Sequence, residues 1–502
     1  MKKRVTVCAA GRYVLPTFAA VAFVCLGLRA EGMVSISDFV PYMRAGRIAV
    51  RVQVTNALDR TVAARLTANI GGLIECATNI TVAAGRVKLA ILLFGDVPDR
   101  FPLTKFGWKV CVESSGGSDA KSGTADVDGA IRHLAATLIG RQERQPNARY
   151  CDYFFADVYA ARALMGLGDA WTNAAWSASG RRWVEEGLVA RQHEDGGYPM
   201  GYGEEAGVHW VADNGTAALG VVDAAARYGD VRERYLASVK RYYGFRDSFY
   251  QSAERVVALE GRFGKDPHFI CEGLYGIGVN DGDYVDRLKE KARATAMHQK
   301  LKAKPKGQPL VRTERGLPWV NGISLLSLPA YWRMTGDTNV LAVALRDLDR
   351  YLDGAKTLNY FGAETIYQCV RNLPPSPSVE KARKLLEDGF LKRLSDNWGE
   401  DKQPKDKGGR RTLDALTAVY ALHDSGGARQ DLRSYVAYMA WYVASREYRR
   451  SVFNAERLFA KSYFGEMSGK RYEAMSLAWL AELMRPGCTL PLPECAARRD
   501  VR

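Results

Sequence analysis

The sequence HWVADNGTAALGVVDAAARYGD, residues 209–230, contains the unit that decides the fold. An aromatic residue stands near an acidic and an amide residue, a run of small and aliphatic residues follows, and a Gly-Asp pair closes the unit. Small residues let helices pack closely on all sides, so this run is typical of an inner helix. The next segment, residues 231–243, has a polar face and is typical of an outer helix.

Similar units recur from about Gly129 onward, where the apolar residues change from alternate spacing to helical spacing. Further openings lie at residues 150–152, 268–273, 318–322, 360–364, 411–414 and 471–473, and further closing turns lie at Gly168-Asp169, Gly282-Asp283 and Gly336-Asp337. The openings number seven if residues 129–142 form the first outer helix. We therefore expect a mainly α domain over residues 129–486, an (α/α)6 or (α/α)7 toroid of helical hairpins, with a tail at 487–502.

The segment before this domain has a different period. Between residues 47 and 114, apolar residues such as Val50, Val52 and Val54 alternate with polar ones, which predicts short half-buried strands. We expect a small β-sandwich of immunoglobulin-like type over residues 31–113, acting as a spacer or as a wall for the helical domain. A glycan-binding module is the alternative. The Gly- and Ser-rich stretch that follows predicts a linker over residues 114–128.

The first thirty residues have the composition of a leader. Lys2, Lys3 and Arg4 precede an apolar run at residues 13–28, and Leu28-Arg29-Ala30 resembles a cleavage site. This order predicts a signal peptide over residues 1–30 and an exported protein, periplasmic or extracellular. An uncleaved membrane anchor is the alternative. No later segment is apolar enough to predict a membrane span.

Charge and cysteine content narrow the classes of partner. The net charge is +15, and removing the five cationic residues of the leader leaves +10. This balance suits an acidic polysaccharide, or else a solvated surface, and no nucleic-acid-binding motif is present. Two cysteine pairs are candidates for disulfides, Cys76 with Cys111 and Cys488 with Cys495. Cys151, Cys271 and Cys369 lack metal-ligand spacing, so neither a metal nor a cofactor is predicted.

The expected toroid places the openings of its inner helices together. Parallel inner helices have their N-termini at one end, so one funnel would be lined by the acidic or amide residues Asp152, Asp213, Glu272, Asn321, Glu364, Asp414 and Glu473. The aromatic residues Trp210, Phe269, Trp319 and Tyr360 would lie between them. Each acidic or amide residue also suits an N-terminal helix cap, which is the structural alternative.

The loop at residues 192–205 combines glycines, aromatic residues and four carboxylates, those of Glu194, Asp195, Glu204 and Glu205. A carboxylate pair with aromatic platforms is what glycosidic bond cleavage requires. The alternative is a Gly-rich turn that positions Tyr198 against the helix ends.

The turn Asp195-Gly196-Gly197-Tyr198, the segment Trp210-(x)2-Asp213-Asn214-Gly215 and the closing Gly229-Asp230 together resemble the six-hairpin glycosidase-like superfamily, over roughly residues 129–484. That superfamily includes unsaturated glucuronyl hydrolases, other glycoside hydrolases, polysaccharide lyases and sugar epimerases. Its glucuronyl hydrolase branch acts through aspartates, which Asp213 and Asp152 match, although the full motif of that branch is absent. The resemblance thus implies a carbohydrate-active enzyme.

Three hypotheses follow. A glycoside hydrolase would use Asp213 with Glu272 or Asp152, and a polysaccharide lyase would use Tyr202 or His209 as base with an Arg or Lys facing a uronate. A noncatalytic toroid would bind glycan or protein. The candidate substrate-binding residues are Asp195, Tyr198, Glu204, Glu205, Trp210, Asn214, Trp319, Asn321, Tyr360 and Glu364. Terpenoid cyclases and complement-like thioester domains share such toroids, but their motifs are missing from this sequence.

Overall fold

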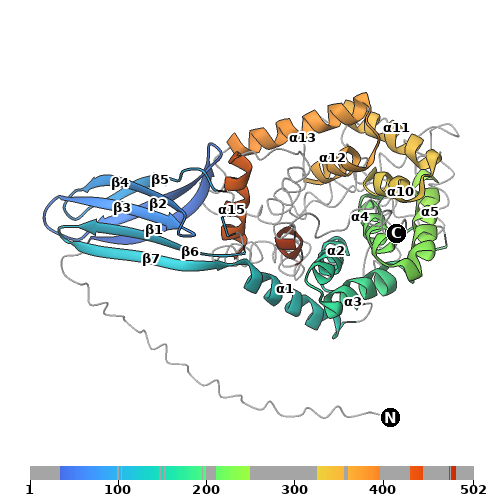
Figure 1. Ribbon diagram of the computed structural model, residues 1–502, viewed down its shortest axis with the longest axis horizontal. Coiled ribbons are helices and arrows are strands. Elements are labelled where there is room, and N and C mark those ends of the chain that lie inside the picture. Colours follow the sequence, from blue (N-terminus) through green and yellow to red (C-terminus); the bar gives the residue numbers. More distant parts are fainter. Residues whose placement is uncertain are drawn as a thin grey trace, which may run out of the picture.

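The computed structural model describes residues 34–98, 101–102, 104–145, 148–151, 154–194, 196–198, 211–248, 325–354, 360–395, 430–444, 474 and 476–481. Among the described residues, strands occupy the N-terminal part up to residue 126 and helices predominate after it (Figure 1). No helix in these ranges is long and apolar enough to cross a membrane. The predicted leader and the predicted tail lie outside the described residues.

Seven strands form two antiparallel sheets that pack against each other. They are β1 (Val34–Arg44), β2 (Arg47–Asn56), β3 (Val62–Ile70), β4 (Ile74–Val82), β5 (Val87–Leu93), β6 (Lys105–Ser114) and β7 (Gly117–Asp126). One sheet has the order β1-β2-β5 and the other β4-β3-β6-β7. The alternation on β2 has the expected consequence, because Val50, Val52 and Val54 are fully buried in the core between the sheets.

The predicted linker is wrong for its larger part, because residues 117–126 form strand β7. This strand pairs with β6 from Ser114↔Gly117 to Lys105↔Asp126. Packing explains the glycine at position 123, because a Cβ atom there would lie 2.6 Å from Cζ2 of Trp108 on β6. A Gly- and Ser-rich composition therefore serves close contact with a tryptophan here, and the chain passes directly from β7 into the first helix.

The predicted pairing of Cys76 with Cys111 is also wrong, since both thiols are free. Cys76 lies on β4 opposite Ala68, and Cys111 lies on β6 opposite Thr67. Consecutive residues of β3 point to opposite faces, so the two thiols are on opposite sides of the sheet and two strands apart. Burial raises the pKa of the Cys76 thiol to about 12. The other predicted pair, Cys488 and Cys495, lies outside the described residues.

The helices form two concentric arcs (Figure 1). The outer arc contains α1 (Val127–Gln142), α3 (Ala174–Trp183) with its π-helical continuation η2 (Val184–Val189), α5 (Arg232–Ser248), α11 (Thr338–Gly354), α13 (Pro377–Ser395) and α15 (Gln430–Ala444). The inner arc contains α2 (Phe154–Ala170), α4 (Val211–Arg227), α10 (Leu328–Thr335) and α12 (Tyr360–Asn372). Within the described ranges, an inner helix is followed by an outer one four times, as the repeated unit predicts.

Neighbouring outer helices run in the same direction. Lys240 on α5 pairs with Asp337, the residue before α11, and Arg246 on α5 pairs with Asp347 on α11. The residue numbers therefore increase in the same direction along both helices. Between α11 and α13, the contacts of Asp349 with Ser378 and of Asp353 with Lys381 show the same progression.

The inner helices α2 and α4 are likewise parallel to each other. The Cβ position of Gly220 on α4 is 3.1 Å from a methyl carbon of Val158 on α2, and three residues further Asp223 meets Arg162. Gly220 lets the two helices approach at this point. The N-terminal ends of α2 and α4 therefore lie at the same end of the inner arc.

Some of the predicted Gly-Asp pairs lie in the turns between an inner helix and the outer helix that follows it. Gly336 ends α10 with φ +69°, a left-handed cap that favours glycine. Gly229 begins the short 3-10 helix Gly229–Val231 between α4 and α5. Gly168 and Asp169 instead stay inside the last turn of α2, and Asn173 caps α3 by accepting from the N–H of Trp176 at 3.2 Å.

Candidate site at the ends of the inner helices

The predicted site residues divide into three groups by what the structure describes. Asp152, Asp195, Tyr202, Glu204, Glu205, His209, Trp210, Glu272, Trp319 and Asn321 lie outside the described residues. Asp213 and Tyr360 are placed by backbone alone, in the first turns of α4 and α12. Tyr198, Asn214 and Glu364 are placed with their side chains.

Asn214 and Tyr198 are brought together by a two-point contact, which we name the Asn214 clamp. Oδ1 of Asn214 accepts from the backbone N–H of Tyr198 at 2.6 Å, and Nδ2 donates to the carbonyl oxygen of Tyr198 at 3.2 Å. Both residues are fully buried. Because Asn214 lies in the first turn of α4, the clamp fixes the end of the glycine-rich turn to the start of this inner helix.

The side chain of Tyr198 packs into the protein. Its hydroxyl lies 3.0 Å from Oγ of Ser238, and its ring lies 5.8 Å from that of Tyr242, both on α5. Burial raises the pKa of the Tyr198 hydroxyl above its ordinary value. These contacts match the alternative considered from the sequence, in which the turn positions Tyr198 against helices, and they present no free ring face for a sugar.

Gly196 and Gln192 explain why the turn has its composition. Gly196 has φ +95°, and a Cβ atom there would lie 2.3 Å from the carbonyl oxygen of Arg241 on α5. Nε2 of Gln192 donates to the carbonyl oxygens of Gly196 and Ser238, each at 2.8 Å. The turn therefore lies directly on α5, and glycine is required for that approach.

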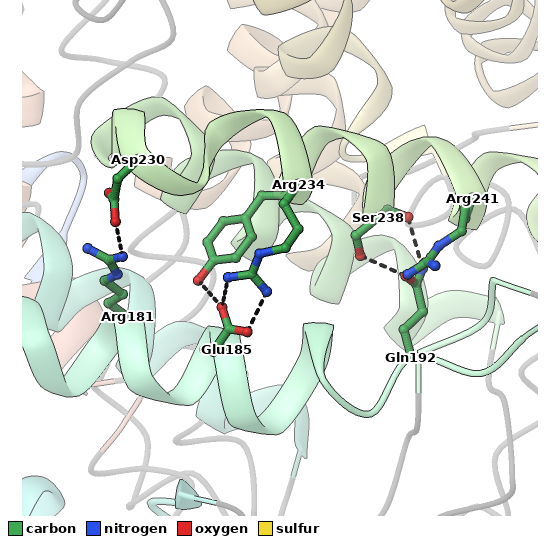
Figure 2. Close-up of polar contacts among 8 residues, drawn as sticks. Arg181, Glu185, Gln192, Asp230, Arg234, Ser238 and Arg241 are labelled. Atoms are coloured by element: carbon green, nitrogen blue, oxygen red, sulfur yellow. Dashed lines mark hydrogen bonds and ion pairs between the residues drawn. The ribbon is translucent and has the colours of Figure 1, made fainter.

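The same Gln192 ends a polar seam between residues 181–192, which include η2, and residues 230–241, which include most of α5; Figure 2 shows this seam. Its Oε1 accepts from Oγ of Ser238 at 2.8 Å and from Nε of Arg241 at 3.1 Å. Earlier along the seam, Arg181 pairs with Asp230. The order of these contacts shows that α3 with η2 runs parallel to α5.

Glu185 forms the middle of the seam. Its two oxygens accept from Nη1 and Nη2 of Arg234 at 2.5 and 2.6 Å, and the hydroxyl of Tyr235 donates to it at 2.8 Å. The hydrogen bonds from Arg234 and from Tyr235 hold the pKa of the Glu185 carboxyl below its ordinary value, against the opposing effect of burial. The seam makes a fixed outer wall behind the turn.

Glu364 belongs to a buried ionic cluster formed with Arg162, Asp223 and Tyr159. Nε of Arg162 is 2.5 Å from Oδ2 of Asp223, and Nη1 is 2.9 Å from Oε1 of Glu364. The hydroxyl of Tyr159 donates to the other oxygen of Glu364. Each of the three charged residues is at most 7% exposed.

This cluster joins three inner helices, because its members come from α2, α4 and α12. Glu364 was predicted as a substrate-binding residue or as a helix cap, but its described contacts are with Arg162 and Tyr159. Arg162 and Asp223 were not among the predicted site residues. The available signal was a lone arginine inside the apolar run of α2.

Asp157 is a second carboxylate that sequence reasoning did not single out. It is fully buried in the first turn of α2, and its Oδ1 accepts from the N–H of Cys151 at 2.8 Å and from Sγ of Cys151 at 2.7 Å. It thus holds the segment that opens α2 beside the predicted Asp152. Within the described ranges, no group of three or more His, Cys, Asp or Glu residues is arranged to hold a metal ion.

Comparisons with known proteins were made at the level of sequence and of structure. No family model matches the sequence, and no curated protein matches it. Among solved structures, a thermostable endoglucanase from Alicyclobacillus acidocaldarius is similar with 11% identity and a TM-score of 0.39, covering 89% of this chain and 99% of that one.

Two other solved structures are also similar to this chain. A family 76 glycoside hydrolase from a bovine Bacteroides thetaiotaomicron strain matches with 11% identity, 89% and 99% coverage, and a TM-score of 0.30. The alpha-2-macroglobulin of Escherichia coli matches with 10% identity over 91% of this chain and 38% of that one, at a TM-score of 0.28. With TM-scores below 0.5, these likenesses identify no reaction for this chain.

Proposed function

We propose that this chain is an exported carbohydrate-active enzyme, a glycoside hydrolase that acts on a poly- or oligosaccharide at the N-terminal ends of the inner helices. The Asn214 clamp is the observation that carries this proposal. It fixes the turn ending at Tyr198 to the first turn of α4, where Asp213 immediately precedes Asn214. The clamp thus fixes the backbone of the segment that carries Asp213, and acid–base chemistry needs such defined positioning.

The proposed fold is a closed toroid of six hairpins. The ion pairs Lys240–Asp337 and Arg246–Asp347 make α5 and α11 direct neighbours, which favours six hairpins over seven because it leaves no place for another outer helix between them. The contact of α15 with α1 supports closure of the outer arc. In such a ring, the N-termini of all inner helices would surround one funnel.

The proposed chemistry uses a pair of carboxylates. Asp213 stands at the third position of α4, where the positive end of the helix dipole favours an ionised carboxylate. This suits a nucleophile or a general base, with Asp152 as the partner acid. Glu272 opens the predicted unit that lies between α5 and α11 in the sequence, and it would be the partner acid in a ring of seven hairpins. The sequence-derived charge of +10 after leader removal would favour uronate-containing substrates, whichever carboxylate is the acid.

The ionic cluster favours a second candidate, a noncatalytic toroid that binds glycan or protein. Arg162, Asp223 and Glu364 fill the space between α2, α4 and α12 with groups already paired to each other. A funnel filled at every level would leave no room for a substrate. The cluster lies two helical turns below the start of α2, and the proposal of an enzyme therefore places the sugar above it.

The test is an activity assay on the purified mature protein with a panel of neutral and uronate-containing polysaccharides. We expect new reducing ends without new absorbance from unsaturated products, and we expect Asp213→Asn to abolish them. Asp353→Asn, an exposed aspartate on the outer helix α11, is the matched control and should keep full activity. Unsaturated products would establish a lyase instead, with Tyr202 and His209 as candidate bases. No product from any substrate, with a glycan still retained, would establish the noncatalytic alternative.

A further inference from the structure

Strand β5 carries a row of exposed large apolar side chains. Val87, Leu89, Ile91 and Leu93 are 53%, 54%, 37% and 43% exposed. Because they alternate along the strand, all four point to the face opposite the one on which Ala90 is buried. Soluble proteins seldom leave large apolar groups clustered in water, and such clusters mark contact surfaces.

The row lies at the edge of a sheet. β5 is the last strand in the order β1-β2-β5, and none of the described strands pairs with its outer side (Figure 1). The outward N–H and C=O groups of an edge strand are a template for another strand. Natural edges are usually blocked by charge or proline, but Lys88 is the only charged residue of β5 and no proline is present.

The side chains of the neighbouring strand β2 indicate whether a partner would cover the face of the sheet or pair with its edge. On β2, Gln53 lies opposite Leu89 and Arg51 lies opposite Ile91, so the same face becomes polar one strand further in. A partner laid flat over the whole sheet would cover these polar side chains. A strand that pairs with the outer side of β5 would place its own side chains beside the apolar row and away from the polar side chains of β2. This favours pairing at the edge.

We propose that β5 pairs antiparallel with β5 of a second copy of this chain, about a two-fold axis at Ala90. The row is symmetric about this residue, so Val87 would lie opposite Leu93 of the second copy and Leu89 opposite Ile91 of the second copy. Like-on-like pairing of this kind is what a two-fold interface requires.

The charge on β5 is compatible with this register. Lys88 would face Leu92 of the second copy, and the two Lys88 side chains would be four residues apart, about 13 Å along the strand. A register centred on Lys88 would instead bring two ammonium groups together. The proposed register thus joins the apolar residues and separates the like charges.

The extent of the contact sets the expected affinity. A stable dimer buries roughly 1,200–2,000 Å² in total, and one pair of seven-residue strands covers less than that. We therefore expect a reversible, concentration-dependent dimer with a dissociation constant on the order of micromolar. The proposal concerns the β domain and is independent of the proposed function.

The first test measures molar mass by light scattering after size exclusion, over a wide range of concentrations of the full mature chain. We expect the wild type to approach twice the monomer mass as concentration rises. The double variant Leu89→Lys with Ile91→Lys should stay monomeric, while Gln53→Lys on the neighbouring strand should dimerise as the wild type does. A wild type that stays monomeric, or a double variant that still dimerises, would overturn the proposal.

The second test addresses the register with single cysteine variants. Leu89→Cys and Ile91→Cys chains are mixed, oxidised mildly and compared on a non-reducing gel with each variant alone. Position 89 lies opposite position 91 of the second copy, so the disulfide-linked dimer should form in the mixture, at a level well above either variant alone and above the wild type. Equal cross-linking in all samples would exclude this register, and circular dichroism verifies that each variant is folded.

Discussion

Arg162 on α2 donates to Glu364 on α12 across the inner arc, with Nη1 and Oε1 separated by 2.9 Å and both residues buried. Arg162 also contacts Asp223 on α4, so one guanidinium group joins three inner helices. A buried pair of this kind is costly to desolvate, and its loss is costlier still when one partner remains. We therefore expect the cluster to favour one arrangement of the inner helices.

Replacing Arg162 by Met should destabilise the protein strongly. The variant would leave the carboxylates of Asp223 and Glu364 buried without their common cation, a change that costs about 3–5 kcal/mol in comparable cases. The measurement is the free energy of unfolding from urea denaturation at neutral pH.

The matched control for that experiment is Arg182→Met. Arg182 pairs with Glu186 one turn along the same outer helix, and both side chains are about half exposed. Exposed pairs contribute about 0.2–1 kcal/mol, so a small loss is expected. Equal losses in the two variants would show that the buried cluster has no special role.

The parts of the fold that the sequence predicted depend on local pattern. Val50, Val52 and Val54 alternate within one strand, and the apolar run of α4 lies within one helix, so neighbouring residues alone determine which face is buried. The register of β7 on β6 does not follow from local pattern. It depends on the ring of Trp108, which occupies the space that the missing side chain of Gly123 leaves.

The site was less predictable because its contacts join distant positions. Glu364 and Arg162 are 202 residues apart in the sequence, and Tyr198 meets Ser238 across 40 residues. A carboxylate near a helix opening has the same local sequence whether it faces a funnel or a buried arginine. The sequence alone therefore could not distinguish the role of Glu364 from the role that we propose for Asp213.

Asn214→Ala should loosen the turn that ends at Tyr198. The variant removes both hydrogen bonds of the clamp and leaves the backbone N–H and C=O of Tyr198 without them in a buried position, which costs about 1–3 kcal/mol. If the proposed enzyme is correct, turnover of its substrate should fall as well, because Asp213 loses its fixed neighbour.

Tyr198→Phe distinguishes the contribution of the Tyr198 hydroxyl to stability from the contribution of the clamp. It removes the hydroxyl that contacts Oγ of Ser238 and keeps the ring that packs on Tyr242, so the loss of stability should be smaller, about 1 kcal/mol. Thermal unfolding of both variants measures the difference. A larger effect of Tyr198→Phe than of Asn214→Ala would contradict the role given to the clamp.

Gly196→Ala should destabilise the protein through backbone strain and through a steric collision. Variants of two other glycines distinguish these two effects. The positive φ of Gly196 strains any side chain, and the added Cβ atom would collide with the carbonyl oxygen of Arg241. Gly72→Ala has a positive φ with open space around it, so only the strain applies, about 1–2 kcal/mol. Gly229→Ala has neither problem. We expect losses in unfolding free energy to decrease in the order Gly196, Gly72, Gly229.

Glu185 predicts a pH dependence for the seam between η2 and α5. Hydrogen bonds from Arg234 lower the pKa of its carboxyl in the folded protein, so its contribution is fully present above the ordinary pKa of a glutamate, about 4.3, and is lost as pH falls through the lowered value. The side chain is 33% exposed, which limits the contribution to about 1 kcal/mol. The difference in unfolding free energy between wild type and Glu185→Gln should therefore be constant from pH 7 to pH 5 and shrink toward pH 3. A difference that grows on acidification would mean that Arg234 does not stabilise the ionised carboxylate.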